Sequence, residues 1–120
     1  MNKRAIGRLS ELKVIEHLKE ENIITIKHNY YCKYGEIDII AKKNDTYRFI
    51  EVKYSKSEFI NPLYKLNKTK IKRIYQSSMD YLSKINYKNE NLEYYIYIVN
   101  EKKITSYRFS IDESNYIWIM

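Results

Sequence analysis

The sequence predicts one α/β domain in which a mixed central sheet is flanked by helices. A chain of 120 residues can bury one hydrophobic core and is too short for two of ordinary size, so residues 1–120 are taken as a single domain. Two long segments have the composition and apolar spacing of helices, and five shorter ones are rich in residues that favour strands. Their order along the chain is αβββαββ.

The first half of the chain predicts one helix and three strands. Residues 3–21 are expected to form a helix, because strong helix formers fill this segment. Residues 23–29 are rich in β-branched side chains and predict a strand. Residues 36–42 and 47–54 predict two further strands, which form a hairpin around the Asn-Asp pair at 44–45.

The second half predicts a loop, a helix and two or three strands. The loop is expected at 55–67 and the helix at 68–85. The buried face of this helix is expected to consist of residues at helical spacing: Ile71, Ile74, Tyr75, Ser78, Leu82 and Ile85. Strands are expected at 92–99 and 104–109, which pair as a hairpin. The ending, 116–120, either adds an edge strand or simply covers the sheet.

The composition favours a basic cytoplasmic protein. There are 22 Lys and Arg residues against 15 Asp and Glu, a net charge of +7, which favours binding to polyanions. A protein that is merely soluble and basic remains an alternative. Cys32 is the single cysteine, which excludes a disulfide framework and a thiolate metal cluster. The sequence has no signal-peptide core and no apolar run of roughly 20 residues, so no membrane partner is expected.

The hairpin predicts a pair of carboxylates on one surface of the sheet. With a two-residue loop at 44–45, Asp38 faces Glu51, and Ile37 faces Val52 on the opposite surface. Directly opposed carboxylates have Cβ atoms about 5 Å apart and repel each other, so a cation must compensate. Lys53 supplies one positive charge, and a hard divalent cation with oxygen ligands would supply more. A solvated polar face with Lys53 as a salt-bridge partner is the alternative.

The first helix adds a third carboxylate. Gly7, Glu11, Val14, Ile15 and Leu18 fall within one arc of the helix, and Glu11 lies in the middle of that apolar arc. The glycine one turn earlier is expected to let another backbone come close. An unpaired carboxylate buried there would cost several kcal/mol or become protonated, and a cation would resolve the conflict. In the alternative interpretation the side chain lies at the edge of the stripe and extends to water.

Two motifs in the hairpin resemble a known family. Gly-Glu-Ile-Asp-Ile-Ile at 35–40, followed by Phe-Ile-Glu-Val-Lys at 49–53, resembles the YraN-like family of predicted endonucleases. That family is similar to archaeal Holliday-junction resolvases and to the wider PD-(D/E)xK nuclease superfamily. The resemblance covers roughly residues 4–85. Further matching positions are Gly7, Glu11, Asn29, Lys70 and Gln76, and departures are Ser10, Ser78 and the strand at 94–96.

The resemblance implies a restriction-endonuclease-like core with a metal-dependent active site. Asp38 and Glu51 would bind Mg²⁺ or Mn²⁺, with the Val52 carbonyl oxygen as a further ligand. Glu11 would act directly or through a water, and Lys53 would orient or activate the attacking water and counter charge on the phosphate. These four side chains and one carbonyl are the expected catalytic and metal-binding groups. Oxygen ligands suit hard ions, so His17 and His28 are interpreted as surface or structural histidines.

A cationic cluster near the start of the second helix predicts a DNA-binding surface. Its expected members are Lys65, Lys68, Lys70, Lys72, Arg73 and Gln76. Cations at a helix N-terminus oppose the macrodipole, and contact with phosphates would offset that cost. The ordinary abundance of lysine in this chain is the alternative explanation.

Three functional hypotheses follow. The leading one is a metal-dependent nuclease that hydrolyses phosphodiester bonds of DNA, including branched or otherwise structured DNA. The second is a non-catalytic DNA-binding or assembly module that keeps the nuclease fold, and the third is a scaffold stabilised by ion pairs. Resolvases of this superfamily often work as symmetric dimers, so a homodimer is left open, although the sequence identifies no interface.

Overall fold

The computed structural model describes residues 2–57, 66–112 and 117–119. Its elements follow one another in the order α1 (Lys3–Glu20), β1 (Ile24–Cys32), β2 (Gly35–Lys43), β3 (Thr46–Tyr54), α2 (Lys68–Ser83), β4 (Asn91–Val99), β5 (Ile104–Asp112) and β6 (Ile117–Ile119). The expected order αβββαββ is confirmed, and the ending adds an edge strand. Most of the expected loop, at 58–65, lies outside the described residues. No helix in the described ranges is both long and apolar enough to cross a membrane.

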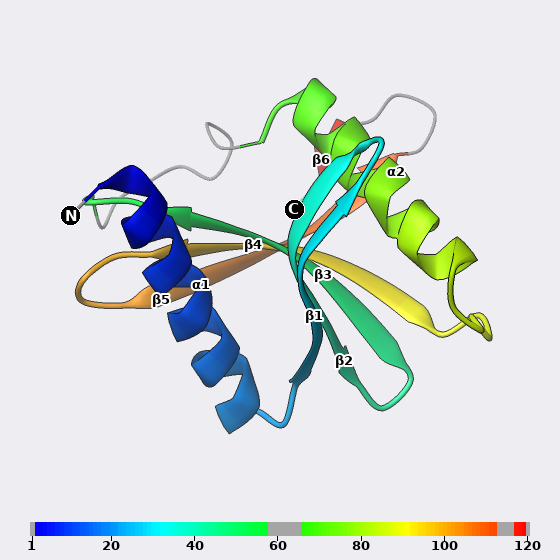
Figure 1. The fold of residues 1–120 in the computed structure, drawn as a ribbon, viewed down its shortest axis with the longest axis horizontal. Helices are drawn as coiled ribbons and strands as arrows, with labels where there is room; N and C mark the ends of the chain where they lie inside the picture. Colours follow the sequence, from blue (N-terminus) through cyan, green and yellow to red (C-terminus); the bar gives the residue numbers. More distant parts are fainter. Residues whose placement is uncertain (1, 58–65, 113–116, 120) are drawn as a thin grey trace.

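The six strands form one mixed sheet, with the spatial order β1-β2-β3-β4-β5-β6 (Figure 1). β3 and β4 run parallel, and the other neighbouring strands run antiparallel. A parallel connection needs a crossover, and α2 provides it between β3 and β4. The mixed central sheet flanked by helices is therefore confirmed.

Each helix covers a different hydrophobic cluster of the twisted sheet. Val14 and Leu18 of α1 are fully buried in a cluster with Ile39, Ile50 and Val99. The second cluster joins α2 to the alternate residues of the central strands and includes Ile40, Phe49, Ile71, Ile74, Leu82, Ile96 and Ile98. This alternation follows from the two-residue period of a strand. Of the side chains expected to face inward on this helix, four are buried and Tyr75 is partly buried. Ile85, also partly buried, lies beyond the helix, which ends at Ser83 and not at the expected residue 85.

The β2–β3 hairpin has the predicted register at its turn but not along its whole length. Its pairs run from Lys43↔Thr46 to Ile39↔Ile50, so the two-residue turn is confirmed. Beyond Ile39 no further β2–β3 pair forms within the described residues, and β2 continues only against β1. The expected pairing of Ile37 with Val52 is wrong, because Ile37 lies in the α2 cluster.

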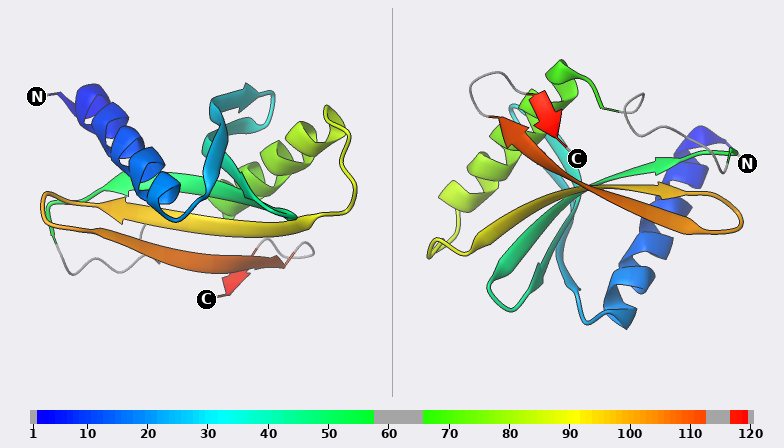
Figure 2. Two further views of the ribbon diagram at one scale, coloured as in Figure 1. Left: turned by 90° about the horizontal axis from the view of Figure 1, so that it is seen from below. Right: turned by 180° about the vertical axis from the view of Figure 1, so that it is seen from behind.

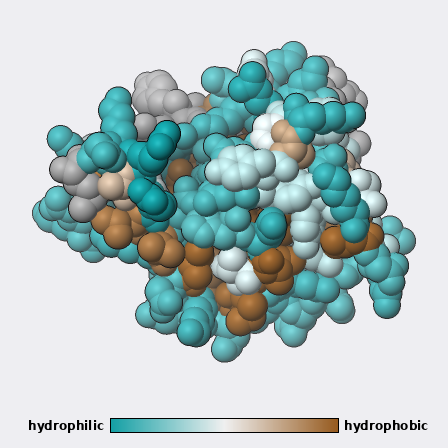
Figure 3. All heavy atoms as spheres, viewed as in Figure 1, coloured by the Kyte–Doolittle hydropathy of each residue, from teal (hydrophilic) through white to brown (hydrophobic). Residues whose placement is uncertain are grey.

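The free end of the β1–β2 hairpin leaves the plane of the sheet. Figure 2 shows it rising between α1 and α2. Gly35 lies at this end next to α2: its φ of 145° is one that side chains rarely adopt, and a Cβ there would be in van der Waals contact with the Arg73 side chain, at 3.5 Å. Most of the face seen in Figure 3 is hydrophilic, with hydrophobic side chains gathered around α1 and the neighbouring strands. The hairpin end therefore stands between both helices, where the motif residues gather.

Candidate active site

Asp38 and Glu51 lie at the point where β2 and β3 separate. Both carboxylates belong to residues that are more than nine-tenths buried, with 7% and 8% of their surface exposed. In place of the next backbone pair, the Asp38 carboxylate accepts a hydrogen bond of 2.8 Å from the Val52 backbone N–H. This bond links the two strands after their pairing has ended. The structure therefore brings Asp38 next to the Glu51–Val52 peptide. The expected direct pairing of Asp38 with Glu51 does not form in the described strands, because the β2–β3 pairs end at Ile39↔Ile50.

The environment of Asp38 disfavours its charged form. Burial, followed by the charge of Glu51, raises the pKa of Asp38 to about 8. Glu11 and Glu36 raise it further, and the hydrogen bond from Val52 opposes them. The charges of three other carboxylates therefore act on Asp38, one more than the sequence motifs suggested. The additional one belongs to Glu36, two residues before Asp38 in the same motif.

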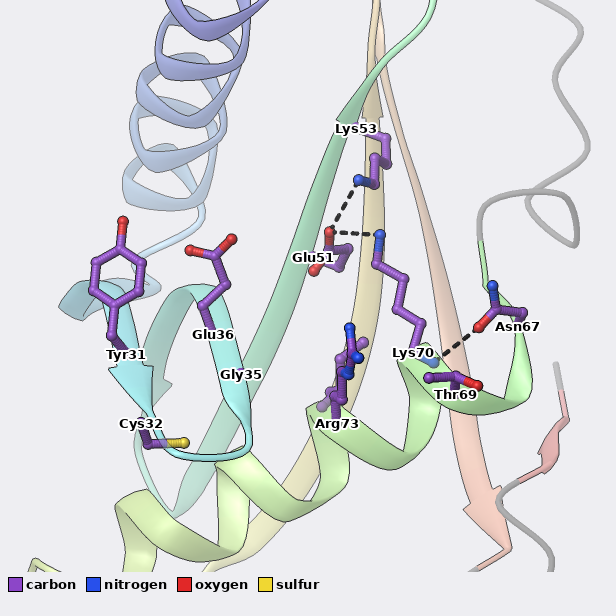
Figure 4. A pocket seen from close by; sticks show the side chains of 11 residues that line it. Tyr31, Cys32, Gly35, Glu36, Glu51, Lys53, Asn67, Thr69, Lys70 and Arg73 are labelled. Carbon is purple, nitrogen blue, oxygen red and sulfur yellow. Dashed lines mark hydrogen bonds and ion pairs between the residues drawn. The ribbon is translucent and has the colours of Figure 1, made fainter.

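Two lysines from different elements hold Glu51. The Lys53 Nζ lies 3.4 Å from the Glu51 Oε1, and the Lys70 Nζ lies 3.2 Å from the same oxygen (Figure 4). Burial disfavours the charged form of both amines. The pKa of Lys53 is nevertheless raised, because the contact with Lys70 and the charge of Glu51 outweigh burial. The pKa of Lys70 is lowered, chiefly by burial. Lys70 was expected only as a DNA contact, and its position beside Glu51 was missed.

Glu11 reaches the same region from α1, and its partner is a histidine. The Glu11 Oε1 lies 2.7 Å from the Nε2 of His28. Glu11 and Asp38 line one cavity of about 440 Å³, so the helix carboxylate lies near the hairpin. Gly7 lines the same cavity, and a Cβ there would meet nothing within 4 Å, so the expected close backbone approach is wrong. The glycine leaves open space instead.

A second cavity, of about 720 Å³, opens between α2 and the hairpin end. It is lined by the cationic side chains of Lys53, Lys70 and Arg73 and by Glu51 (Figure 4). Three other expected DNA-binding residues lie on α2 outside the lining: Lys68, Lys72 and Gln76. Lys65 lies outside the described residues. The cavity has the charge and the side-chain flexibility to accept a phosphate.

The donor chemistry of the site fits a hard divalent cation, but the donors are not gathered around one point. Carboxylate and carbonyl oxygens are suited to Mg²⁺ or Mn²⁺, and burial together with the charge of Glu51 raises the pKa of Asp38. In the described part of the chain, no three His, Cys, Asp or Glu side chains lie close enough together to hold an ion. Both lysine contacts of Glu51 and the His28 contact of Glu11 involve Oε1, so ion binding would require the carboxylates to come closer together but not to lose these partners.

The comparisons with known proteins agree with the motif. The model of the uncharacterised protein family UPF0102 matches residues 10–111. The chain belongs to the UPF0102 family. This is the YraN-like family that the hairpin motifs resemble, so that prediction is confirmed. The family description gives no activity, and the chemistry of the site therefore rests on the residues themselves.

Similar UPF0102 proteins occur in several organisms. The chain is 42% identical to one from Psychromonas ingrahamii over 77 residues, which are 63% of each chain. It is 37% identical to one from Fusobacterium nucleatum, over 78% of this chain and 80% of the relative. One from Pseudoalteromonas translucida is 34% identical over 83% of both chains. A solved structure described as the crystal structure of SSO0001 matches with a TM-score of 0.45 and 19% identity, over 91% of this chain and 52% of that one.

Proposed function

We propose that this UPF0102 protein is a metal-dependent nuclease that hydrolyses phosphodiester bonds of DNA. The observation that supports this function best is the buried carboxylate pair Asp38 and Glu51, adjoining a cavity with three cationic side chains. Burying two carboxylates side by side costs folding free energy, and perturbed clusters of this kind are typical of functional sites. A protein selected for stability alone would gain from replacing one of them.

The roles of the residues follow from their positions. Lys70 and Arg73 would bind the phosphate, and Lys53 would orient the attacking water and hold a proton at its amine. Asp38, Glu51, Glu11 and the Val52 carbonyl oxygen would hold Mg²⁺ or Mn²⁺. Such an ion, when bound, stabilises the negative charge that develops on the phosphoryl oxygens. The exposed cations of α2 would contact neighbouring phosphates and add a salt-dependent component to binding.

A non-catalytic DNA-binding module is the second candidate, and one observation favours it. Glu51 is already neutralised by two lysines, and Glu11 is bound by His28. A site in which lysine and histidine side chains neutralise the carboxylates in place of a metal ion would keep its charge balance but could not hydrolyse DNA. Both candidates use the same cationic cavity, so DNA binding alone does not separate them. We place either activity in the cytoplasm, and homodimer formation remains open to measurement of the mass in solution.

Cleavage of branched and single-stranded DNA in Mg²⁺ or Mn²⁺ tests the proposal. The wild-type protein should nick or cut one of these substrates, whereas Asp38→Ala and Lys53→Ala should bind it without cutting. Equal cleavage by the wild type and both variants would reveal a contaminating nuclease. Binding without cleavage by the wild type, with either ion, would favour the non-catalytic module.

A further inference from the structure

Tyr31 is an exposed aromatic side chain at the entrance of the candidate site. It is the second-last residue of β1, and 69% of its surface is exposed. Among the tyrosines whose side chains the structure describes, it alone is exposed, and the others are buried or half-buried. The chain has 14 tyrosines, so the abundance of tyrosine alone is no evidence for stacking. The position of this one ring is therefore the informative feature.

Tyr31 and Glu36 separate the two cavities of the site. The two residues oppose each other in the β1–β2 pairing, and Figure 4 shows their side chains pointing the same way from neighbouring strands. Both residues line the cavity of about 720 Å³ and also the cavity of about 440 Å³. A ligand that occupies both cavities must therefore pass over this pair.

Cations lie on both sides of that partition. Lys70 and Arg73 line the larger cavity, and the exposed Arg4 and Arg8 of α1 line the smaller one. The two carboxylates of the site are divided in the same way, because Glu51 lines the larger cavity and Asp38 the smaller. A polyanion with regularly spaced phosphates would place a phosphate on each side and expose the intervening unit to Tyr31.

We propose that Tyr31 stacks on a nucleobase beside the bond to be cut, and that the site takes DNA with unpaired nucleotides there. This inference rests on the proposed function and specifies its substrate class. A base within a duplex already has both faces covered by its neighbours, so an exposed ring cannot reach either face. A base in a single strand, flap or splayed junction has a free face, and stacking on an aromatic side chain strengthens its binding regardless of sequence.

The test is equilibrium binding in EDTA, so that no cutting occurs. The probes are a labelled oligodeoxythymidylate and a blunt duplex of the same length. Tyr31→Ala should weaken single-strand binding by about tenfold, and Tyr31→Leu should weaken it too because leucine has no π face. Tyr31→Phe should stay within about twofold of the wild type. Tyr31→Ala and Tyr31→Leu should reduce the affinity for the duplex much less than the affinity for the single strand. Tyr34→Ala is the matched control, since this half-buried tyrosine of the same hairpin lines neither cavity.

The outcomes separate this inference from the nuclease proposal. Equal single-strand affinities of the wild type, Tyr31→Ala and Tyr31→Leu would overturn the stacking role, even if the wild type cuts DNA. If Tyr31→Ala and Tyr31→Leu bind single-stranded DNA more weakly than the wild type, but the wild type never cuts DNA, stacking is supported and the nuclease proposal is refuted. Equal losses in Tyr31→Ala and Tyr34→Ala would assign the effect to the hairpin fold and overturn the inference. Wild-type protein that binds neither DNA would overturn both proposals.

Discussion

Replacing Asp38 by asparagine should stabilise the metal-free protein at neutral pH. At neutral pH the folded protein keeps Asp38 protonated, because burial and Glu51 disfavour its charge, whereas the unfolded chain ionises it. Asparagine is neutral in both states and removes this cost, and its oxygen can still accept the hydrogen bond from the Val52 N–H. The shape of the side chain is almost unchanged, so the hydrophobic packing around it should persist. The variant therefore isolates the electrostatic cost of the site.

The size of the effect follows from the shift in the Asp38 pKa from 3.8 to about 8. Because the folded protein holds this proton more tightly, stability is fully present below the unfolded pKa and is lost as pH rises towards the folded one. Each pH unit within that window lowers the free energy of unfolding by about 1.4 kcal/mol. The advantage of the Asp38→Asn variant should therefore grow by roughly 3 kcal/mol between pH 5 and pH 7.

Urea unfolding in EDTA at several pH values measures this difference. Asp45→Asn is the control, because Asp45 is an exposed carboxylate on the turn at the other end of β2. Its free energy of unfolding should follow the wild-type pH profile within about 0.5 kcal/mol. Parallel profiles for the wild type and Asp38→Asn would refute the reasoning, since they would mean that Asp38 is charged in the folded protein without a penalty.

Three further outcomes are expected. Mn²⁺ at a hundred times its dissociation constant should raise the free energy of unfolding of the wild type by about 2.7 kcal/mol in thermal unfolding. The same concentration should leave the stability of Asp38→Asn unchanged. The double replacement of Lys68 and Lys72 by alanine should weaken DNA binding and reduce the slope of affinity against salt by up to about two, whereas Lys103→Ala on the distant β4–β5 turn should not. Leu18→Ala should cost about 2–5 kcal/mol in urea unfolding, and Leu12→Ala, which is 49% exposed, less than about 1 kcal/mol.

The sequence predicted the fold, and with it the strands that contain Asp38 and Glu51, because both depend on local periodicity. The turn at 44–45 and the alternation of the strands determined the register as far as Ile39, and helical spacing indicated Val14 and Leu18. Beyond Ile39 the alternation no longer applies, because β2 leaves β3 and follows β1. A pattern of residue types contains no signal for such a departure.

The partners of the carboxylates could not be predicted in the same way. The contact of Lys70 with Glu51 depends on how α2 packs across the sheet, and the contact of His28 with Glu11 depends on the distance between α1 and β1. Neither relation follows from spacing along the chain. The lysine cluster on α2 was interpreted through the helix dipole, which explained a preference for anions but not which carboxylate would be nearest.

The separation of the hairpin from β3 has a mechanical consequence. Glu51 belongs to a strand that β4 fixes along its length, whereas Asp38 belongs to a protruding two-stranded arm. A small tilt of this arm changes the gap between the two acids and leaves the rest of the sheet intact. A group that bridges the two acids would therefore hold the arm in one position. Its binding should slow the exchange of the arm's backbone amide hydrogens with solvent.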